Sequence, residues 1–142
     1  MNAGFSESRT AVIFRSEGGL YAFGIENLLE ILSEREVTPV PCLPEYVLGV
    51  INLRGEVIPV IDLRRRLGFE DAEPTGREAL LVIECDGVTA AVRADTVVTS
   101  MTYEEDGYMP LEEESVAAGI ILDGDEQITL IDPNKLLKNE KM

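Results

Sequence analysis

The sequence has 142 residues and no histidine, and its 12 Lys and Arg against 27 Asp and Glu give a formal net charge of −15. At this length we expect one compact domain, and 45% hydrophobic residues supply a core that a disordered acidic chain lacks. So acidic a surface repels phosphate backbones and anionic lipid headgroups, which excludes nucleic acid and the membrane surface as main partners. The absence of histidine excludes imidazole bases, histidine metal ligands and Ser-His or Cys-His nucleophile pairs.

Other residues and motifs that catalysis commonly uses are also scarce. All three lysines, Lys135, Lys138 and Lys141, lie in the last eight residues, and no glycine-rich phosphate motif is present. Cys42 and Cys85 lack a CxxC spacing, which favours two buried free thiols in a reduced cytoplasmic protein. Most carboxylates stand in runs typical of solvated loops, so we expect no catalytic pair, no cofactor and no metal site. No apolar run is long enough to insert into a membrane.

The first half of the chain begins with a polar segment, 1–8, that we expect to be flexible. Short apolar segments rich in Val and Ile follow, as is typical of small β-barrels or sandwiches. Gly18-Gly19 interrupts the apolar stretch 11–25 and predicts a β-hairpin, because tight hairpin turns require positive φ. Residues 28–32 fit a helical turn and a bulged strand equally well, so both remain open.

The second half begins after a loop-like segment, 69–77, that combines acidic residues with proline and glycine. Asp86-Gly87 then interrupts the apolar stretch 80–92, and this dipeptide is a stronger hairpin signal than Gly-Gly. We therefore expect a second hairpin there.

Two features near residue 60 carry further predictions. Pro59 lies within an apolar strand and cannot donate a ladder hydrogen bond, so we expect it near an exposed sheet edge. The run Arg64-Arg65-Arg66 favours local ion pairs near the end of a short helix over a basic docking patch.

An internal repeat relates residues 49–62 to residues 119–132 at a constant offset of 70, with six identities among fourteen positions. Each copy predicts a strand, a polar turn, a second strand and an aspartate, Asp62 or Asp132, that can cap a short helix. A hairpin precedes each copy, so each half holds about five strands, enough for a small closed barrel. We therefore expect a mostly β chain of two five-stranded β-barrel subdomains with short helices.

The turn Asn52-Leu53-Arg54-Gly55 differs from its counterpart in the repeat, which reads as an ordinary hairpin turn at 122–125. A turn at this place therefore requires neither the apolar Leu53 nor the planar, hydrogen-bonding Arg54. Arginine is enriched among interface anchors, which favours a recognition turn. A turn arginine that only pairs with a nearby glutamate is the alternative.

The segment 49–68, from Gly-Val-Ile-Asn-Leu-Arg-Gly to Asp-Leu-Arg-Arg-Arg-Leu-Gly, closely resembles the signature of the CheW family, the coupling proteins of bacterial chemotaxis. Weaker likeness covers nearly the whole chain. The resemblance implies a single CheW-like domain over residues 9–139, built from two intertwined SH3-like barrels. The first barrel is expected roughly over 20–68 and the second roughly over 78–132, with the terminal segments packing across them.

The resemblance also implies a non-enzymatic cytoplasmic adaptor that is recruited to membrane receptor arrays. Its implied partners are the regulatory domain of a CheA-type chemotaxis histidine kinase and the helical-hairpin tip of a methyl-accepting receptor. The implied kinase interface is Leu28, Glu30 and Gly49, and the implied receptor interface is Asn52, Leu53, Arg54, Val97 and Ser100. A CheW-like scaffold of a non-chemotaxis signalling array, with motility, development or a cyclic dinucleotide as output, remains the alternative.

Overall fold

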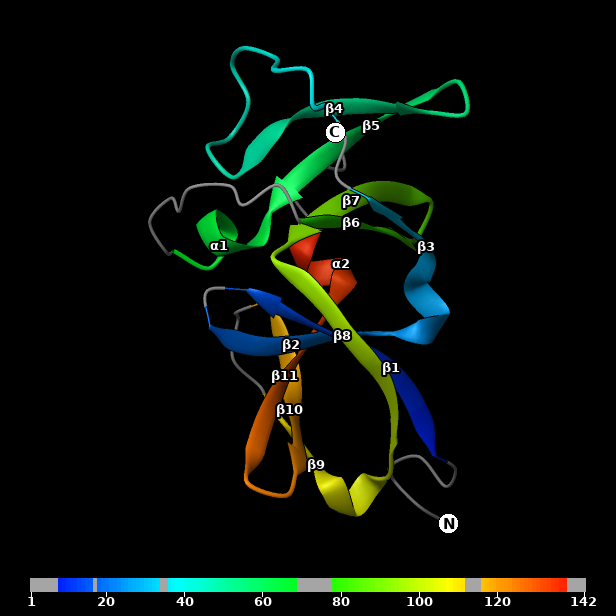
Figure 1. The fold of residues 1–142 in the computed structure, drawn as a ribbon, viewed down its shortest axis with the longest axis vertical. Coiled ribbons are helices and arrows are strands. Elements are labelled where there is room, and N and C mark those ends of the chain that lie inside the picture. Colours follow the sequence, from blue (N-terminus) through cyan, green and yellow to red (C-terminus); the bar gives the residue numbers. More distant parts are fainter. Residues whose placement is uncertain (1–7, 17, 34–35, 69–77, 112–115, 138–142) are drawn as a thin grey trace.

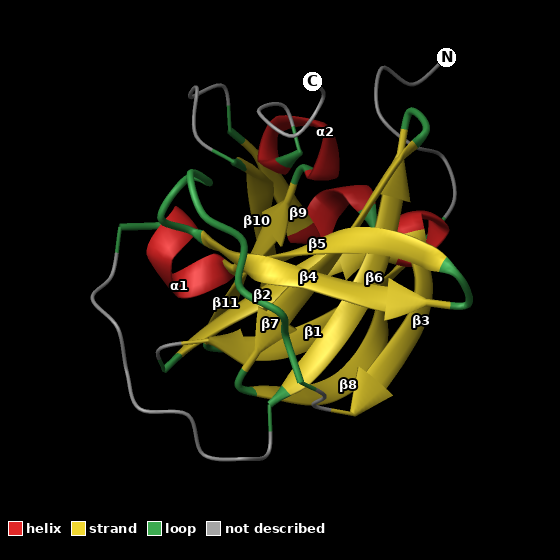
Figure 2. Ribbon diagram, turned by 90° about the horizontal axis from the view of Figure 1, so that it is seen from above, coloured by secondary structure: helices red, strands yellow, loops and turns green. Residues whose placement is uncertain are grey.

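The computed structural model describes residues 8–16, 18–33, 36–68, 78–111 and 116–137, so the predicted flexible segment up to residue 7 and the segment 69–77 lie outside the described residues. Strands dominate the fold (Figure 2). The strands are β1 (Arg9–Ser16), β2 (Gly19–Gly24), β3 (Leu28–Ser33), β4 (Val47–Leu53), β5 (Glu56–Asp62), β6 (Ala79–Cys85), β7 (Val88–Ala94), β8 (Thr96–Tyr103), β9 (Tyr108–Pro110), β10 (Ala117–Asp123) and β11 (Glu126–Ile131). The helical elements are the 3-10 turns η1 (Ile25–Asn27) and η2 (Glu105–Gly107) and the α-helices α1 (Leu63–Arg66) and α2 (Pro133–Leu136).

The strands form two sheets. One has five strands in the order β3-β6-β7-β5-β4, and the other has six in the order β8-β1-β2-β11-β10-β9. In Figure 1 the five-stranded sheet lies in the upper half and the six-stranded sheet in the lower half, with α2 between them. The predicted mostly β fold with two β subdomains is confirmed, and one sheet gains a sixth strand, the short β9.

Each sheet contains a hairpin from the other half of the chain. The β1–β2 hairpin joins the six-stranded sheet because β2 pairs in parallel with β11, and the β6–β7 hairpin joins the five-stranded sheet because β7 pairs in parallel with β5. The subdomains are thus intertwined, but the sheets do not follow the predicted ranges 20–68 and 78–132. Turn residues identify the two strands of a hairpin, whereas pairing between hairpins depends on contacts distant in sequence.

The strands β1 and β6 are buried on both faces. Along β6, Leu80 and Val82 belong to a core inside the five-stranded sheet, whereas Leu81 and Ile83 belong to a core shared by the two sheets. β1 alternates in the same way between the shared core and a core inside the six-stranded sheet. Burial on both faces explains why these strands read as continuous apolar runs rather than as alternating patterns.

The predicted repeat is confirmed in its register. Each pair between β10 and β11 carries residue numbers 70 higher than the matching pair between β4 and β5, and both hairpins have a register shift beside their first glycine. The predicted caps are confirmed too, because the Asp62 carboxylate accepts a hydrogen bond from the Arg64 backbone N–H at 3.1 Å and Asp132 accepts one from that of Asn134 at 2.9 Å.

The strands β3 and β8 are related in the same way at an offset of 69. In β3, Leu28, Glu30 and Ile31 pair with Ile83, Val82 and Leu81, while in β8, Val97, Thr99 and Ser100 pair with Phe14, Ile13 and Val12. The residue numbers in β8 are 69 higher than those in β3, and the numbers of their partners in β1 are 69 lower than those in β6, so the two strands are pseudo-equivalent. Each is an edge strand of its own sheet, and sheet edges present backbone groups that other chains can engage.

The structure bears on two further predictions, one for residues 28–32 and one for Pro59. Residues 28–32, for which helix and strand were both open, lie in strand β3. Pro59 lies in β5, which is an interior strand. The described pairing of β5 with β7 begins only at Val60, so at Pro59 the strand is paired with β4 alone. Among the described residues, no helix has the length and apolar character needed to cross a bilayer.

Candidate functional site

The turn between β4 and β5 holds Arg54 in a conformation that L-amino acids rarely adopt. Arg54 has a φ of 54° and Gly55 a φ of 88°, and two successive positive values are typical of a type I′ hairpin turn. Arginine is disfavoured there because its Cβ approaches the following carbonyl oxygen. The Asn52 Oδ1 accepts a hydrogen bond from the Gly55 N–H at 2.9 Å, which closes the turn.

The Arg54 guanidinium forms a two-pronged ion pair with the Glu30 carboxylate of β3. The Arg54 Nη2 donates to Oε1 at 2.9 Å, and Nη1 donates to Oε2. The side-chain hydrogen bond to Glu30, followed by charge attraction, raises the pKa of Arg54 above its ordinary value. The Arg54 side chain is still 71% exposed and that of Glu30 26% exposed, so a partner can reach both.

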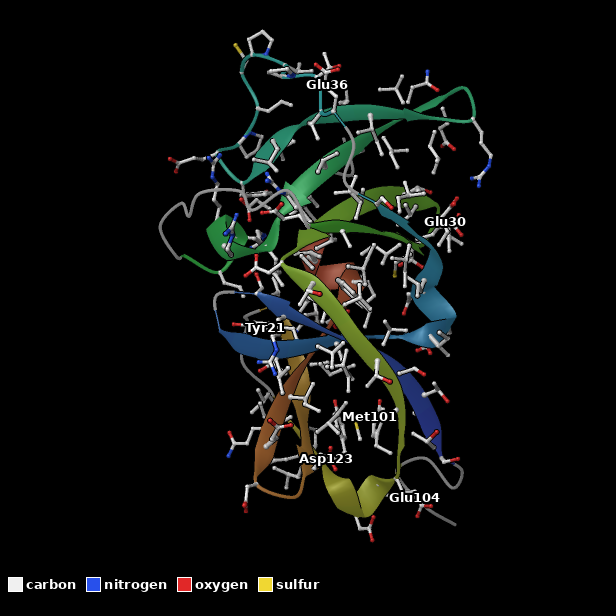
Figure 3. The ribbon with its side chains drawn as sticks, viewed as in Figure 1. Tyr21, Glu30, Glu36, Met101, Glu104 and Asp123 are labelled. Atoms are coloured by element: carbon white, nitrogen blue, oxygen red, sulfur yellow. The ribbon has the colours of Figure 1, made fainter. Side chains whose placement is uncertain are left out.

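This ion pair connects the two edges of the five-stranded sheet. Glu30 lies on β3, at one edge, and Arg54 follows β4, at the other. Figure 3 shows Glu30 on β3 at the right of the upper sheet. The sequence assigned the two residues to separate interfaces, and the structure brings them together in one cluster. The alternative prediction, a turn arginine paired with a nearby glutamate, describes the observed contact, and that glutamate is itself a predicted interface residue.

Exposed apolar residues lie close in sequence to Glu30 and Arg54. Leu29 and Ile31 flank Glu30 on β3 with 55% and 45% exposure, and Val57 on β5 is 63% exposed. Sequence analysis missed Leu29 and Ile31 because residues 28–32 were not assigned to a strand. In a strand, alternate residues face opposite sides, which would have identified Leu29 and Ile31 as an outward pair.

The other predicted interface residues take more varied places. Leu28 and Val97 are half-buried and pack against the shared core, and Leu53 packs against the core inside the five-stranded sheet. Ser100 is exposed on β8. Only the exposed members of the predicted set can therefore meet a partner with most of their side chain.

Gly49 is buried, in contrast to the other predicted kinase-interface residues. Its φ is 152°, and a Cβ built there would lie 2.2 Å from the carbonyl oxygen of Thr38. Thr38 also exchanges two backbone hydrogen bonds with Val50, each 2.9 Å long. Gly49 thus permits the segment at Thr38 to lie against β4, and it presents no side chain to a partner.

The edge strand β8 has different surface chemistry from β3. Its exposed hydroxyl side chains are Thr96, Thr99, Ser100 and Thr102, beside one exposed apolar residue, Val98. By the registers given above, Thr99 occupies the place of Glu30, and Gly124 occupies the place of Arg54. The two pseudo-equivalent surfaces therefore present different groups to solvent.

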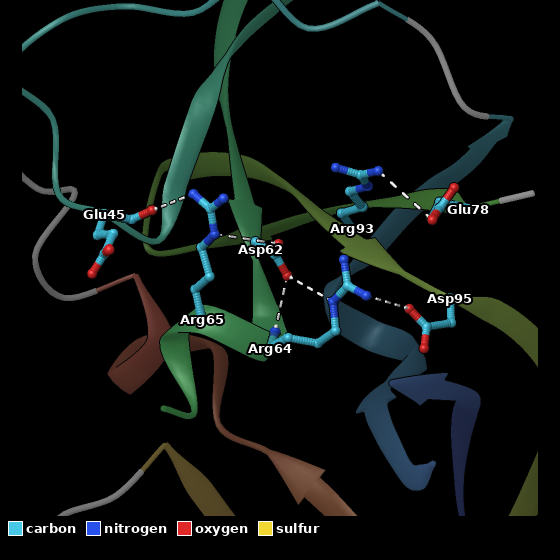
Figure 4. A network of polar contacts seen from close by, with 7 residues as sticks. All are labelled: Glu45, Asp62, Arg64, Arg65, Glu78, Arg93 and Asp95. Atoms are coloured by element: carbon cyan, nitrogen blue, oxygen red, sulfur yellow. Dashed lines mark hydrogen bonds and ion pairs between the residues drawn. The ribbon is translucent and has the colours of Figure 1, made fainter. Parts of the chain in front are cut away.

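A second polar cluster lies where the chain passes from β7 to β8 (Figure 4). Arg64 and Asp62 are buried, and the Arg64 Nε lies 3.4 Å from the Asp62 Oδ1. The Arg64 Nη1 lies 3.6 Å from the Asp95 Oδ1, and Arg65 donates to the carbonyl oxygen of Glu45 at 3.0 Å. These contacts confirm the predicted local pairing of the arginine run, and they fix the segment from which β8 begins.

The described residues contain no group of three or more Cys, Asp or Glu placed to hold a metal ion. Cys42 and Cys85 are free thiols, as predicted, but Cys42 is exposed and Cys85 half-buried, so the prediction of two buried thiols was wrong. Cys42 lies in a loop at a φ of 67°, away from the apolar strands where a thiol is packed.

Comparisons with known proteins agree on one family. The sequence model of the CheW-like domain matches residues 10–141. The chain is 31% identical to the chemotaxis protein CheW of Rhizobium meliloti over 94% of this chain and 90% of that protein, and 31% identical to the chemotaxis protein CheW of Bacillus subtilis over 99% and 94%. Protein FrzA of Myxococcus xanthus is 42% identical over 51% of this chain and 46% of its own.

The fold also matches a solved structure. The crystal structure of the scaffolding protein TtCheW from Thermoanaerobacter tengcongensis superposes with a TM-score of 0.82 at 28% sequence identity. The match covers 88% of this chain and 89% of that chain.

Proposed function

Because this chain belongs to the CheW-like domain family, we propose that it is a non-enzymatic adaptor that couples methyl-accepting chemotaxis receptors to a CheA-type histidine kinase. One observation carries the proposal: the two pseudo-equivalent edge strands, β3 and β8, present different chemistry on one molecule. An adaptor needs two such surfaces, because its two partners must be distinguished and held together. The similarity to the scaffolding protein TtCheW supports the same role.

The proposed kinase surface is centred on β3. It comprises the predicted residues Leu28, Glu30 and Gly49, to which the structure adds Leu29 and Ile31. Leu29 and Ile31 provide exposed apolar area, and Glu30, which lies between them in the sequence, provides a charge. Leu28 and Gly49 support this surface from within the fold. Leu28 packs against the shared core, and Gly49 permits the segment at Thr38 to lie against β4. We propose that this surface binds an apolar patch on the regulatory domain of the kinase.

The proposed receptor surface has two parts, which are the turn after β4, where Arg54 adjoins Glu30 of the proposed kinase surface, and the edge strand β8. Its residues are Asn52, Leu53, Arg54, Val97 and Ser100. The hydroxyl-rich edge of β8 suits a polar partner surface, and the guanidinium of Arg54 can bind a carboxylate or carbonyl oxygen of the receptor tip. Through this surface a cytoplasmic protein would be recruited to membrane receptor arrays.

The absence of catalysis is supported by the composition. The full sequence holds no histidine, so it cannot supply a histidine phosphoacceptor or an imidazole base. The proposal needs no cofactor and no metal ion.

Arg54→Asn tests the proposal because it separates folding from recognition. Asparagine followed by glycine is favoured in a type I′ turn, so this variant should melt at the same temperature as the wild type or higher. Binding should nevertheless weaken about tenfold or more for the receptor tip, because the two-pronged guanidinium is lost. Calorimetric titration with the receptor tip and with the kinase regulatory domain measures both affinities.

Arg54→Lys is the matched control, and it should recover only part of the affinity because ammonium keeps the charge and loses the planar fork. Wild-type affinity of Arg54→Asn for both partners would overturn the assignment of Arg54 to recognition. Failure of the wild-type chain to bind either partner would overturn the proposed function itself.

The similarity to Protein FrzA favours one second candidate, a CheW-like scaffold in a non-chemotaxis signalling array, because that relative does not carry a chemotaxis name and is 42% identical over half of this chain. Motility, development or a cyclic-dinucleotide pathway would then be the output. Deletion of the gene followed by a swimming assay distinguishes the two, since only the chemotaxis adaptor is required for biased swimming.

A further inference from the structure

We infer that Asn52 is a positioning residue that acts through Arg54, an inference that rests on the proposed function and refines its receptor surface. The Asn52 side chain already has a partner within the turn, because its Oδ1 accepts the Gly55 N–H at 2.9 Å. Leu53 and Arg54 lie between them, and Arg54 has a φ of 54°. Asn52 thus stabilises the backbone conformation from which the guanidinium reaches Glu30.

The repeat supplies an internal comparison. In the second copy, Leu122 stands where Asn52 stands in the first, and Gly124 stands where Arg54 stands. Gly124 has a φ of 62°, which glycine adopts without a steric penalty. The chain therefore has a side-chain acceptor in the turn that must hold arginine in the left-handed region, and an apolar residue in the turn that holds glycine there.

The position of the guanidinium depends on this turn. Arg54 and Glu30 come from opposite edges of the five-stranded sheet, and they meet through two parallel N–H···O bonds. Paired bonds of this kind require a defined approach of the guanidinium plane. Loss of the Asn52 acceptor allows Arg54 to return to negative φ, which directs its side chain away from β3 and releases Glu30.

Substitutions at Asn52 test this role. Asn52→Leu, which copies Leu122, should weaken binding to the receptor tip about three- to tenfold. Asn52→Asp keeps the acceptor oxygen and should stay within about twofold of the wild type. In an Arg54→Ala background, Asn52→Leu should cause no further loss, because residues that act through a shared group are not additive.

A measurement without any partner makes the test independent of the proposed function. In NMR spectra of the ¹⁵N-labelled full chain, the Arg54 Nε–H should show restricted motion in the wild type and in Asn52→Asp, and free motion in Asn52→Leu. Glu30→Gln is the control, since it should release the guanidinium while Asn52 is intact.

Restricted motion of the Arg54 Nε–H in Asn52→Leu would overturn the inference. So would an undiminished effect of Asn52→Leu in the Arg54→Ala background, because Asn52 would then contact the partner directly. If the wild-type chain binds no receptor tip while the NMR result holds, the proposed function fails and the positioning role of Asn52 stands.

Discussion

Gly49, Arg54 and Gly55 all have positive φ in the first repeat copy, but for different physical reasons. Gly49 must lack a side chain because the backbone of Thr38 occupies the space. At Gly55 a Cβ would have no atom within 4 Å, so only its φ of 88° favours glycine. Arg54 is disfavoured by its own backbone, and the role that we propose for it is recognition of a partner. On this proposal, residues selected for packing, for recognition and for turn geometry lie within seven positions.

Gly49→Ala and Gly55→Ala should therefore differ in stability. Gly49→Ala adds a steric clash with backbone to an unfavourable φ and should lower the free energy of unfolding by at least about 2 kcal/mol. Gly55→Ala has only the backbone cost and should lower it by about 1 kcal/mol. Urea denaturation of both variants measures the difference, and equal losses would contradict the role given to the Thr38 contact.

At the scale of elements, β3 and β8 show how one architecture can carry two surfaces. The two strands have the same register against β6 and β1 and the same edge position, yet β3 exposes Leu29 and Ile31 and β8 exposes mainly hydroxyl groups. Because the backbone is pseudo-equivalent, any difference in partner choice must come from the side chains.

Leu29→Ser and Val98→Ser form a matched pair, since Val98 lies 69 positions after Leu29. Leu29→Ser removes exposed apolar area from the proposed kinase surface and should weaken binding of the kinase regulatory domain about tenfold if Leu29 is buried on binding. Val98→Ser should leave that affinity within about twofold. Surface plasmon resonance with the immobilised kinase domain compares them, and equal affinities, or a larger loss from Val98→Ser, would refute the surface on β3.

At the scale of the whole molecule, the exchanged hairpins make the two sheets one structural unit. The five-stranded sheet takes β6 and β7 from the second half, and the six-stranded sheet takes β1 and β2 from the first. The shared core adds residues from both sheets, including Phe14, Phe23, Ile61 and Leu81. Neither sheet is complete within one half of the chain.

Cleavage between the halves tests this description. A protease site inserted within residues 69–77 and cut after folding should leave both fragments in one particle with the far-UV spectrum of the intact chain. Size-exclusion chromatography in native buffer and in urea provides the measurement. Fragments that separate in native buffer would show that each half is complete alone.

The sequence contained local information about the fold and less about its long-range pairing. Turns at Gly18 and Asp86-Gly87, the caps at Asp62 and Asp132 and the repeat are set by neighbouring residues, and all were predicted correctly. The residue patterns themselves did not identify the exchange of hairpins, because parallel pairing leaves no local signal; only the family resemblance implied intertwined barrels. Likewise, Arg54 was recognised as unusual, but its contact with Glu30 depends on the meeting of two sheet edges.

The exchange of hairpins also has a consequence for the newly made chain. On the ribosome β1 and β2 are synthesised first, yet their neighbours β8 and β11 are completed only at residues 103 and 131. The five-stranded sheet, by contrast, can form once residue 94 has emerged. The earliest apolar hairpin therefore waits longest for its sheet. Both of its strand edges stay open until β8 has been synthesised, and the edge of β2 stays open until β11 follows, so chaperones or another nascent chain can reach them.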